Sequence, residues 1–381
     1  MGRTALVLGA GIGGITAARA LRKRLPANDR VVVVERESTH VFAPALLWYI
    51  VGNSEPADFT RQLTKLQAKG IELVSAEVTR LDPTALTIEV GARTLTGDAM
   101  IVALGADYTP ENVPGLVERG HNLYTLAGAR GIRAELDQFR AGRIVVLTAA
   151  PGYKCPAAPY EAAMLIEAFC RKRGLRDKTE IAIHAAEPAP MPVAGPAIGS
   201  QIRSMLERKA ITYFPQRQVV RVDDGMLTFS EGQTAAFDLL IYVPPHQAPA
   251  VVRDAGLCGE SGWVPVERHT LATKFPNIWA IGDVTAIPLK MGRPLPKAGV
   301  FAGRQAEVVA ENIASIWGGR AASVRFDGHG SCFVEIGGGM AGMGGGNFYA
   351  EPLPDVHMRF PNPLWHLVKF LHQKVWLSRQ L

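Results

Sequence analysis

Four cysteines are the first residues in the chain that could do chemistry: Cys155, Cys170, Cys258 and Cys332, among 381 residues. So few thiols in so long a chain do not make a disulfide scaffold, and the absence of Cys-x-x-Cys argues against a zinc ribbon. Structural thiols, a metal site or a few redox-active cysteines remain. Cys170 lies on an apolar helix face and Cys258 follows an apolar stretch, so both are expected to be buried structural residues.

A glycine turn near the N-terminus is the second chemical signal. Gly9, Gly11 and Gly14 form G-x-G-x-x-G directly after the expected strand 4–8. Such a turn lets a pyrophosphate approach the backbone amides at the start of a helix. Glu35 ends the next expected strand, where a carboxylate accepts hydrogen bonds from ribose and disfavours a 2′-phosphate. The pattern predicts a dinucleotide site.

Two similar sets of elements must position these residues. Apolar runs predict buried parallel strands, with a helix after the first strand of each set. The strands are expected at 4–8 and 31–34, and again at 143–148 and 180–185, with a helix at 158–173. Strands at 218–222 and 239–243 are expected to complete the second sheet. Residues 277–285 and a helix at 298–316 are expected to return to the first domain.

We therefore predict an α/β protein with two Rossmann-like dinucleotide-binding domains and a C-terminal membrane-associating helical segment. The first domain is assigned to residues 1–108 and 266–320, and the second to 109–265. Residues 321–381 are expected to hold a Gly-rich loop that carries Cys332, followed by an amphipathic tail.

The second domain lacks the glycine turn of the first. After the strand at 143–148 only Gly152 remains, and Pro151 and Pro156 have no backbone N–H to donate. A pyrophosphate would find few donors there, so we infer that this domain has lost nicotinamide binding.

The tail has the pattern of an interfacial helix. On a helical wheel one face is apolar, with Leu364, Leu367, Val368, Leu371 and Val375. The opposite face is polar, with His366, Lys369, Gln373 and Gln380. The alternative is an ordinary helix that packs on the body of the protein or on a partner.

Composition narrows the classes further. The chain has 41 basic and 35 acidic side chains, for a net charge of +6, which is too weak an excess to indicate nucleic acid. No apolar run is long enough to span a bilayer, and the N-terminus does not resemble a secretory leader. We expect no metal, and a peripheral, monotopic position at the cytoplasmic face of the cell membrane. The sequence allows a homo-oligomer.

Two later motifs resemble those of flavoproteins with two dinucleotide-binding domains. Residues 273–283 resemble the late FAD motif, which implies that Asp283, after Gly282, binds the ribityl chain. Residues 101–106 resemble the middle motif, although Leu104 replaces its usual Thr. The resemblance implies further FAD contacts at Pro44, Val78, Ala103, Gly105, Lys297, Ala298 and Gly299. No cysteine lies near Pro44 or Leu126, so we predict non-covalent FAD.

Residues 151–161 and 331–339 resemble the two redox-cysteine segments of sulfide:quinone oxidoreductases and of flavocytochrome c sulfide dehydrogenase flavoproteins. The resemblance implies a Cys155–Cys332 disulfide that HS⁻ attacks, with Cys332 on the flavin side. Glu161 is a candidate proton carrier, and Lys154 a candidate for lowering a thiol pKa. Lys297 would add charge near the flavin or quinone carbonyl. Residues 106–154 lack the third cysteine of many family members.

The resemblance implies hydrogen sulfide, a quinone (ubiquinone or menaquinone) and peripheral membrane lipid as partners. Candidates for lining the quinone entry are Phe42, Phe333, Phe348 and Phe360. The alternatives are a flavocytochrome c-type subunit, a type II NADH:quinone oxidoreductase, and a flavin-bearing protein whose cysteines form a structural disulfide.

Overall fold

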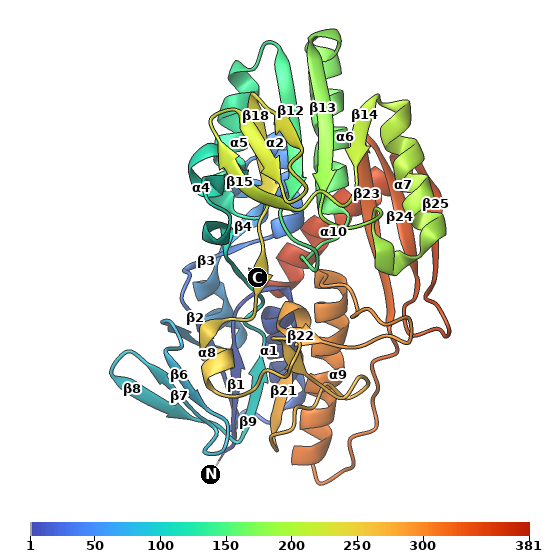
Figure 1. The fold of residues 1–381 in the computed structure, drawn as a ribbon. Coiled ribbons are helices and arrows are strands. Elements are labelled where there is room, and N and C mark those ends of the chain that lie inside the picture. Colours follow the sequence, from blue (N-terminus) through green and yellow to red (C-terminus); the bar gives the residue numbers. More distant parts are fainter. Residues whose placement is uncertain (1) are drawn as a thin grey trace.

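The first domain is built on a parallel five-stranded sheet of order β21-β9-β1-β2-β5 (Figure 1). The computed structural model describes residues 2–381. The strands are β1 (Thr4–Leu8), β2 (Arg30–Glu35), β5 (Glu72–Ser75), β9 (Ala99–Val102) and β21 (Ile278–Ala280). Because β21 pairs with β9 in parallel, the predicted return of the chain to this domain is confirmed.

Helices α1 (Ile12–Arg24) and α9 (Gly299–Trp317) pack against each other and beside this sheet. An antiparallel sheet of β6 (Arg80–Asp82), β7 (Thr87–Val90) and β8 (Arg93–Thr96) adjoins it. Shorter elements of this half are β3 (Thr39–Val41), α2 (Leu46–Ile50), α3 (Pro56–Phe59), β4 (Thr60–Gln62), β20 (Val264–Pro265) and β22 (Thr285–Ala286).

The second domain repeats the design, with a parallel sheet of order β11-β18-β12-β13-β14. Its strands are β11 (His121–Asn122), β12 (Gly142–Thr148), β13 (Thr179–Ala185), β14 (Ile211–Phe214) and β18 (Leu239–Val243). Its helices are α4 (Leu116–Arg119), α5 (Leu126–Gln138), α6 (Ala158–Lys172) and α7 (Pro196–Arg208). The strand expected at 218–222 forms, as β15 (Val219–Asp223), but pairs antiparallel with β16 (Met226–Phe229), which also pairs with β17 (Thr234–Ala236).

The chain crosses between the domains at an antiparallel pair, β10 (Asp107–Tyr108) with β19 (His246–Gln247). Helix α8 (Ala250–Asp254) and the residues after it belong to the first domain, because Val252 and Val264 pack in the core that contains Leu8. The second domain therefore ends near β19, earlier than the expected boundary at 265. The sequence does not show this boundary, because the apolar residues on its two sides could pack equally well in the core of either domain.

The segment expected to be a Gly-rich loop is a β-sheet instead. β23 (His329–Gly337), β24 (Met340–Asn347) and β25 (Asp355–Asn362) pair antiparallel, and Gly337–Gly339 make the first turn with positive φ. The expectation was wrong because backbone hydrogen bonds sustain a strand even where glycines supply no side chains.

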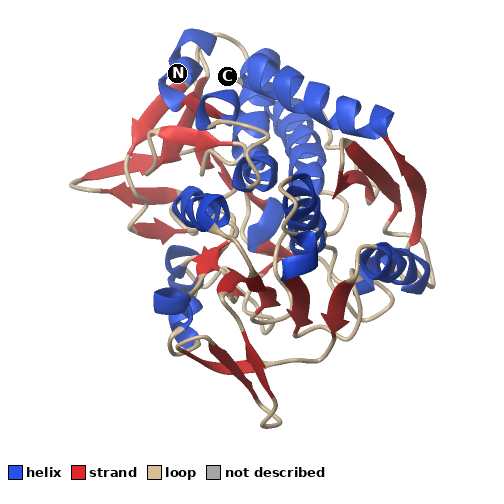
Figure 2. Cartoon of the chain, turned by 90° about the horizontal axis from the view of Figure 1, so that it is seen from above, coloured by secondary structure: helices blue, strands red, loops and turns tan. Residues whose placement is uncertain are grey.

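The tail is helical as expected. α10 (Pro363–Gln380) is capped at its N-terminus by Asn362, whose side chain accepts a hydrogen bond from the backbone N–H of Trp365. It runs from the C-terminal sheet back between the two domains (Figures 1 and 2). Among the described residues, none of the helices has both the length and the apolar character needed to cross a bilayer.

Replacement of Gly14 tests the close approach of α1 to the glycine turn. A Cβ at Gly14 would lie 1.9 Å from the Gly9 carbonyl oxygen, whereas a Cβ at Gly303 in α9 would meet nothing nearer than 3.9 Å. We expect Gly14→Ala to destabilise the fold by about 1–3 kcal/mol or more, as forced overpacking does. Urea unfolding measures this, with Gly303→Ala as the control; equal stability of the two variants would contradict the packing.

Candidate functional site

A cavity of about 710 Å³ extends from the glycine turn to the face of the second domain. Every predicted cofactor residue except Gly14 lines it: Gly9, Gly11, Glu35, Pro44, Val78, Ala103, Gly105, Gly282, Asp283, Lys297, Ala298 and Gly299. Gly14 instead allows the close packing just described. Residues from three distant parts of the first domain thus meet around one space.

The glycines of the turn have different tasks. Gly9 has a φ of +97°, and a Cβ there would lie 2.5 Å from the Ala103 carbonyl oxygen, so the backbone itself requires glycine. Gly11 has an ordinary φ, and a Cβ there would meet no protein atom within 4 Å. Nothing in the fold demands glycine at Gly11, so its bare backbone fits a ligand that approaches the start of α1.

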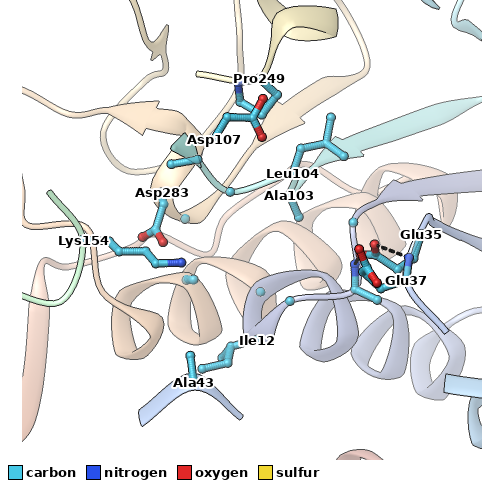
Figure 3. A pocket seen from close by; sticks show the side chains of 18 of the residues that line it. Ile12, Glu35, Glu37, Ala43, Ala103, Leu104, Asp107, Lys154, Pro249 and Asp283 are labelled. Atoms are coloured by element: carbon cyan, nitrogen blue, oxygen red, sulfur yellow. Dashed lines mark hydrogen bonds between the residues drawn. The ribbon is translucent and has the colours of Figure 1, made fainter. Parts of the chain in front are cut away.

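Two carboxylates mark the ends of the cavity (Figure 3). Glu35 is held by the backbone amides of Ala10 (2.7 Å) and Glu37 (3.0 Å), which fix it at the end of β2. At the other end the side chains of Asp283 and Lys154 point toward each other. Asp283 Oδ1 is buried and has no hydrogen-bond partner among the described residues, so it is free to accept from a hydroxyl of a ligand. These features fit FAD, with its pyrophosphate at the turn and its ribityl chain at Asp283.

Lys297 is held at the flavin end of the cavity. Its Nζ donates to the carbonyl oxygens of Asp283 (2.7 Å) and Thr285 (2.9 Å) and lies 3.4 Å from the centre of the Trp263 ring. Burial lowers the pKa of Lys297 to about 8. Its charge is therefore sensitive to small changes around physiological pH.

Cys155 lies in the wall of this cavity and has a positive φ of 49°, an uncommon conformation for a residue with a Cβ. Its backbone N–H donates to the Lys297 carbonyl oxygen at 2.7 Å, which ties the cysteine to the start of α9. Burial and then the charge of Glu161 raise the pKa of its thiol well above the usual value.

Cys332 lies on β23 and is the more exposed residue of the two. Burial and then the charge of Glu161 raise the pKa of its thiol to about 11. Both cysteines are free thiols, and the hydrogen bond from the backbone N–H of Glu335 on β23 to Glu161 of α6 holds the segments that carry them side by side. The resemblance implies that Cys332 is nearer the flavin, whereas Cys155 is the one that lines the cavity.

Lys154 is held by aromatic rings. Its Nζ lies 5.0 Å from the centre of the Tyr108 ring and 5.7 Å from that of Tyr124. Burial alone would lower its pKa, but Tyr108 and Asp283 raise it above the usual value, so the amine stays cationic. Its positive charge therefore lies near the carboxylate of Asp283 as well as near the thiol of Cys155.

A buried charge cluster lies behind the cysteines, which we call the α10 charge cluster: Glu161, Glu335, His366 and Lys369. Glu161 Oε2 accepts from the backbone N–H of Glu335 (2.9 Å) and from Lys369 Nζ (2.8 Å). His366 Nδ1 lies 3.0 Å from Glu335 Oε2. Only Glu161 was expected at the site. The signal for Lys369 and His366 was their place on the polar face of the amphipathic tail, but no role at the site was predicted for them.

Helix α10 is turned with its polar face inward. Lys369 and Gln373 are buried, whereas Leu364, Leu367, Leu371 and Val375 of the predicted apolar face are all exposed, Leu367 by 50%. An ordinary surface helix has the opposite arrangement. The alternative in which this apolar face packs on the body of the protein does not hold.

The phenylalanines predicted for a quinone entry are dispersed. Phe42 packs on Trp376 of α10, with ring centres 5.4 Å apart, and Phe333 lies beside Cys332 on β23. Phe360 is 87% exposed on β25. Phe348 is buried against Phe301 in the first-domain core, so the structure does not bring it to a common entry.

A carboxylate in the second domain has a place near the end of its strand similar to that of Glu35 in the first domain. Glu187 follows β13 as Glu35 ends β2, but it is buried and accepts from three hydroxyls: Thr148 (2.6 Å), Tyr153 (2.5 Å) and Tyr160 (2.6 Å). Tyr153 lies in the segment that replaces the second glycine turn. The Glu187 carboxylate is therefore engaged by hydroxyls of the protein itself.

Titration of Lys297 gives a testable pH dependence. The unfolded chain keeps the Lys297 proton up to a pKa of about 10.4 whereas the folded protein releases it near pH 8, so folding stability rises between these values. We expect Lys297→Met to remove up to about 3 kcal/mol of this rise, measured by urea unfolding across that range. Exposed Lys290→Met is the control. An unchanged pH profile in Lys297→Met would contradict the assignment.

Comparison with known proteins agrees with the fold. The chain is 26% identical to mouse mitochondrial sulfide:quinone oxidoreductase, over 91% of this chain and 79% of that protein. It is 25% identical to type II NADH:quinone oxidoreductase of Staphylococcus aureus, over 82% of each chain. The crystal structure of sulfide:quinone oxidoreductase from Aquifex aeolicus matches with a TM-score of 0.90, at 23% identity, over 99% of this chain and 91% of that chain.

The family model described as pyridine nucleotide-disulphide oxidoreductase matches residues 3–306, most of the chain. This family implies a flavin cofactor, in agreement with the cavity. The chain belongs to the pyridine nucleotide-disulphide oxidoreductase family.

Proposed function

We propose that this protein oxidises sulfide to sulfane sulfur or polysulfide at Cys155 and Cys332, and passes two electrons through FAD to a membrane quinone. The observation that carries the proposal is the hydrogen bond between Glu335 and Glu161, which joins the segments of the two cysteines, with Cys155 in the wall of the cofactor cavity. Similarity to proteins named sulfide:quinone oxidoreductase and sulfide-quinone reductase supports the same function.

The reaction begins when HS⁻ attacks a Cys155–Cys332 disulfide. An S–S bond forms between sulfide and one cysteine, the disulfide breaks, and the other cysteine leaves as a thiolate that carries two electrons. Bound FAD supplies a two-electron acceptor that can be reoxidised by quinone. Glu161 takes the persulfide proton, since burial raises the pKa of its carboxyl.

The flavin is proposed to be non-covalent, because Cys155 is the one cysteine among the described residues that line the cavity. Cys155 is needed for sulfur chemistry. Phe42, Phe333 and Phe360 remain our candidates for contact with the quinone, of which the type stays open between ubiquinone and menaquinone.

A type II NADH:quinone oxidoreductase is the main competing function, since such proteins are similarly close in sequence. The engagement of Glu187 by three buried hydroxyls and the prolines of the second turn argue against it, because a ribose of NADH would have to compete with these hydrogen bonds. A flavocytochrome c-type subunit shares the sulfide chemistry but offers no role for the exposed apolar face of α10.

We further propose that α10 holds the protein on a lipid surface at the cytoplasmic face of the membrane. Its exposed leucines and Phe370, together with exposed Phe360, form an apolar surface that water does not favour. A lipid-soluble electron acceptor is reached from such a position.

Anaerobic mixing tests the sulfide reaction. Sulfide should bleach the flavin absorption, NADH should not, and Cys155→Ser or Cys332→Ser should slow bleaching by at least about a hundredfold, as removal of a covalent catalytic group does. Cys258→Ser is the control with full activity. Bleaching by NADH instead, or undiminished bleaching in both serine variants, would refute the proposal.

Vesicle flotation tests the membrane surface. A double change of Leu367 and Leu371 to Glu removes apolar area that is about half exposed and should abolish binding to phosphatidylglycerol vesicles without altering thermal stability. Val117→Glu, equally exposed on α4, should bind like wild type. If the α10 variant floats as well as the control, the helix is not the anchor.

A further inference from the structure

The α10 charge cluster is connected to both cysteine segments. Glu161 lies in α6, which begins shortly after Cys155, and Glu335 lies on β23 three positions after Cys332. The bond from Glu335 N to Glu161 Oε2 therefore joins the two segments. Lys369 reaches this junction from α10, with its Nζ 2.8 Å from Glu161 Oε2 and 3.7 Å from Glu335 Oε1.

The cluster is dry. The side chains of Glu161 and Glu335 are 3% and 1% exposed and that of Lys369 is 10% exposed. Lys369 Nζ also lies 5.1 Å from the centre of the Trp48 ring, which closes its remaining side. In such surroundings a charge acts on its neighbours far more strongly than it would in water.

Thiolate formation at the cysteines is set by opposing charges from several elements. Glu161 on α6 opposes ionisation of both thiols, and Asp283 opposes that of Cys155. Lys369 on α10 favours ionisation of both. Tyr124 and Lys154 also interact with Cys155, and His366 faces Glu335.

Lys369 reaches this position on the helix whose other face is apolar and exposed. The same rigid element thus presents leucines to the outside and a cation to the sulfur site. Any surface that stabilises the seated position of α10 also stabilises the contact of Lys369 with Glu161, by linkage.

We propose that Lys369 is a positioning residue for the sulfur chemistry: α10, seated by a lipid surface, holds this cation against Glu161 and so favours the thiolate form of both cysteines. The inference rests on the proposed function, in which one cysteine must leave as a thiolate. It makes the reactivity of the cysteine pair depend on membrane docking.

The test measures thiol reactivity rather than turnover, so it does not depend on the sulfide reaction. Reduced holoenzyme is alkylated with iodoacetamide between pH 6 and 11, and modification of Cys155 and Cys332 is followed by peptide mass spectrometry. Lys369→Met should shift both pH profiles upward by about one unit, a tenfold slower reaction at fixed pH. Lys369→Arg should largely retain the wild-type profile, and Lys374→Met, on the exposed side of α10, should not change it.

Glu161→Gln separates an electrostatic role from a structural one. Loss of its negative charge should shift both profiles downward, opposite to Lys369→Met, whereas a merely loosened site would shift both variants in the same direction. Equal profiles for wild type and Lys369→Met, or shifts of the same sign for the two variants, would overturn the role of Lys369.

Vesicles test the link to the membrane. Phosphatidylglycerol vesicles should accelerate alkylation in wild type and leave Lys369→Met unchanged. Wild type that floats with the vesicles but reacts at the same rate would overturn the coupling. Protein that does not float would instead refute the proposed membrane anchor, while the pH profiles in solution still decide the role of Lys369.

Discussion

The hydrogen bond from the backbone N–H of Glu335 to the carboxylate of Glu161, 2.9 Å long, joins segments 174 residues apart. The proposed sulfur site depends on this junction, because one segment carries Cys155 and the other Cys332. A buried carboxylate in that position needs a cation, and Lys369 of α10 supplies it. Removing one partner of such a buried pair typically costs about 3–5 kcal/mol, so the C-terminal helix is part of the site and not an appendage.

Helix α10 also touches the dinucleotide site. Trp376 packs on the ring of His40, with centres 5.1 Å apart, and His40 Nδ1 lies 3.0 Å from the carbonyl oxygen of Ala10 in the glycine turn. The helix therefore contacts Glu161 through Lys369, and it is linked to the cofactor turn through Trp376 and His40. Because Lys369 must face Glu161, the polar face of α10 points inward and its apolar face is exposed.

The two dinucleotide-binding domains share a sheet order but have diverged in chemistry. In the first, Glu35 is held only by backbone amides and Asp283 retains an unpartnered oxygen, so both remain available to a ligand. In the second, Glu187 is buried and accepts hydrogen bonds from the hydroxyls of Tyr153 and Tyr160.

Local patterns in the sequence predicted the cofactor cavity well, because Gly9, Gly11 and Glu35 act through turns and strand ends that short motifs encode. The partners of Glu161 could not be predicted in this way. Lys369 and Glu335 meet it only through tertiary packing, and a lysine on a helix face has the same pattern whether that face meets water or a buried carboxylate. The Gly-rich segment was predicted to be a loop for a related reason. The pairing of β23 with β24 is made by backbone hydrogen bonds, which the side-chain pattern of the sequence does not reveal.

Non-reducing peptide mass spectrometry of the oxidised holoenzyme tests whether Cys155 and Cys332 form the redox pair. We expect a linked peptide that contains both cysteines, with the mass of a disulfide or of a bridge lengthened by additional sulfur after sulfide treatment. Recovery of both residues as alkylated free thiols, or linkage of either one to Cys170 or Cys258, would contradict it.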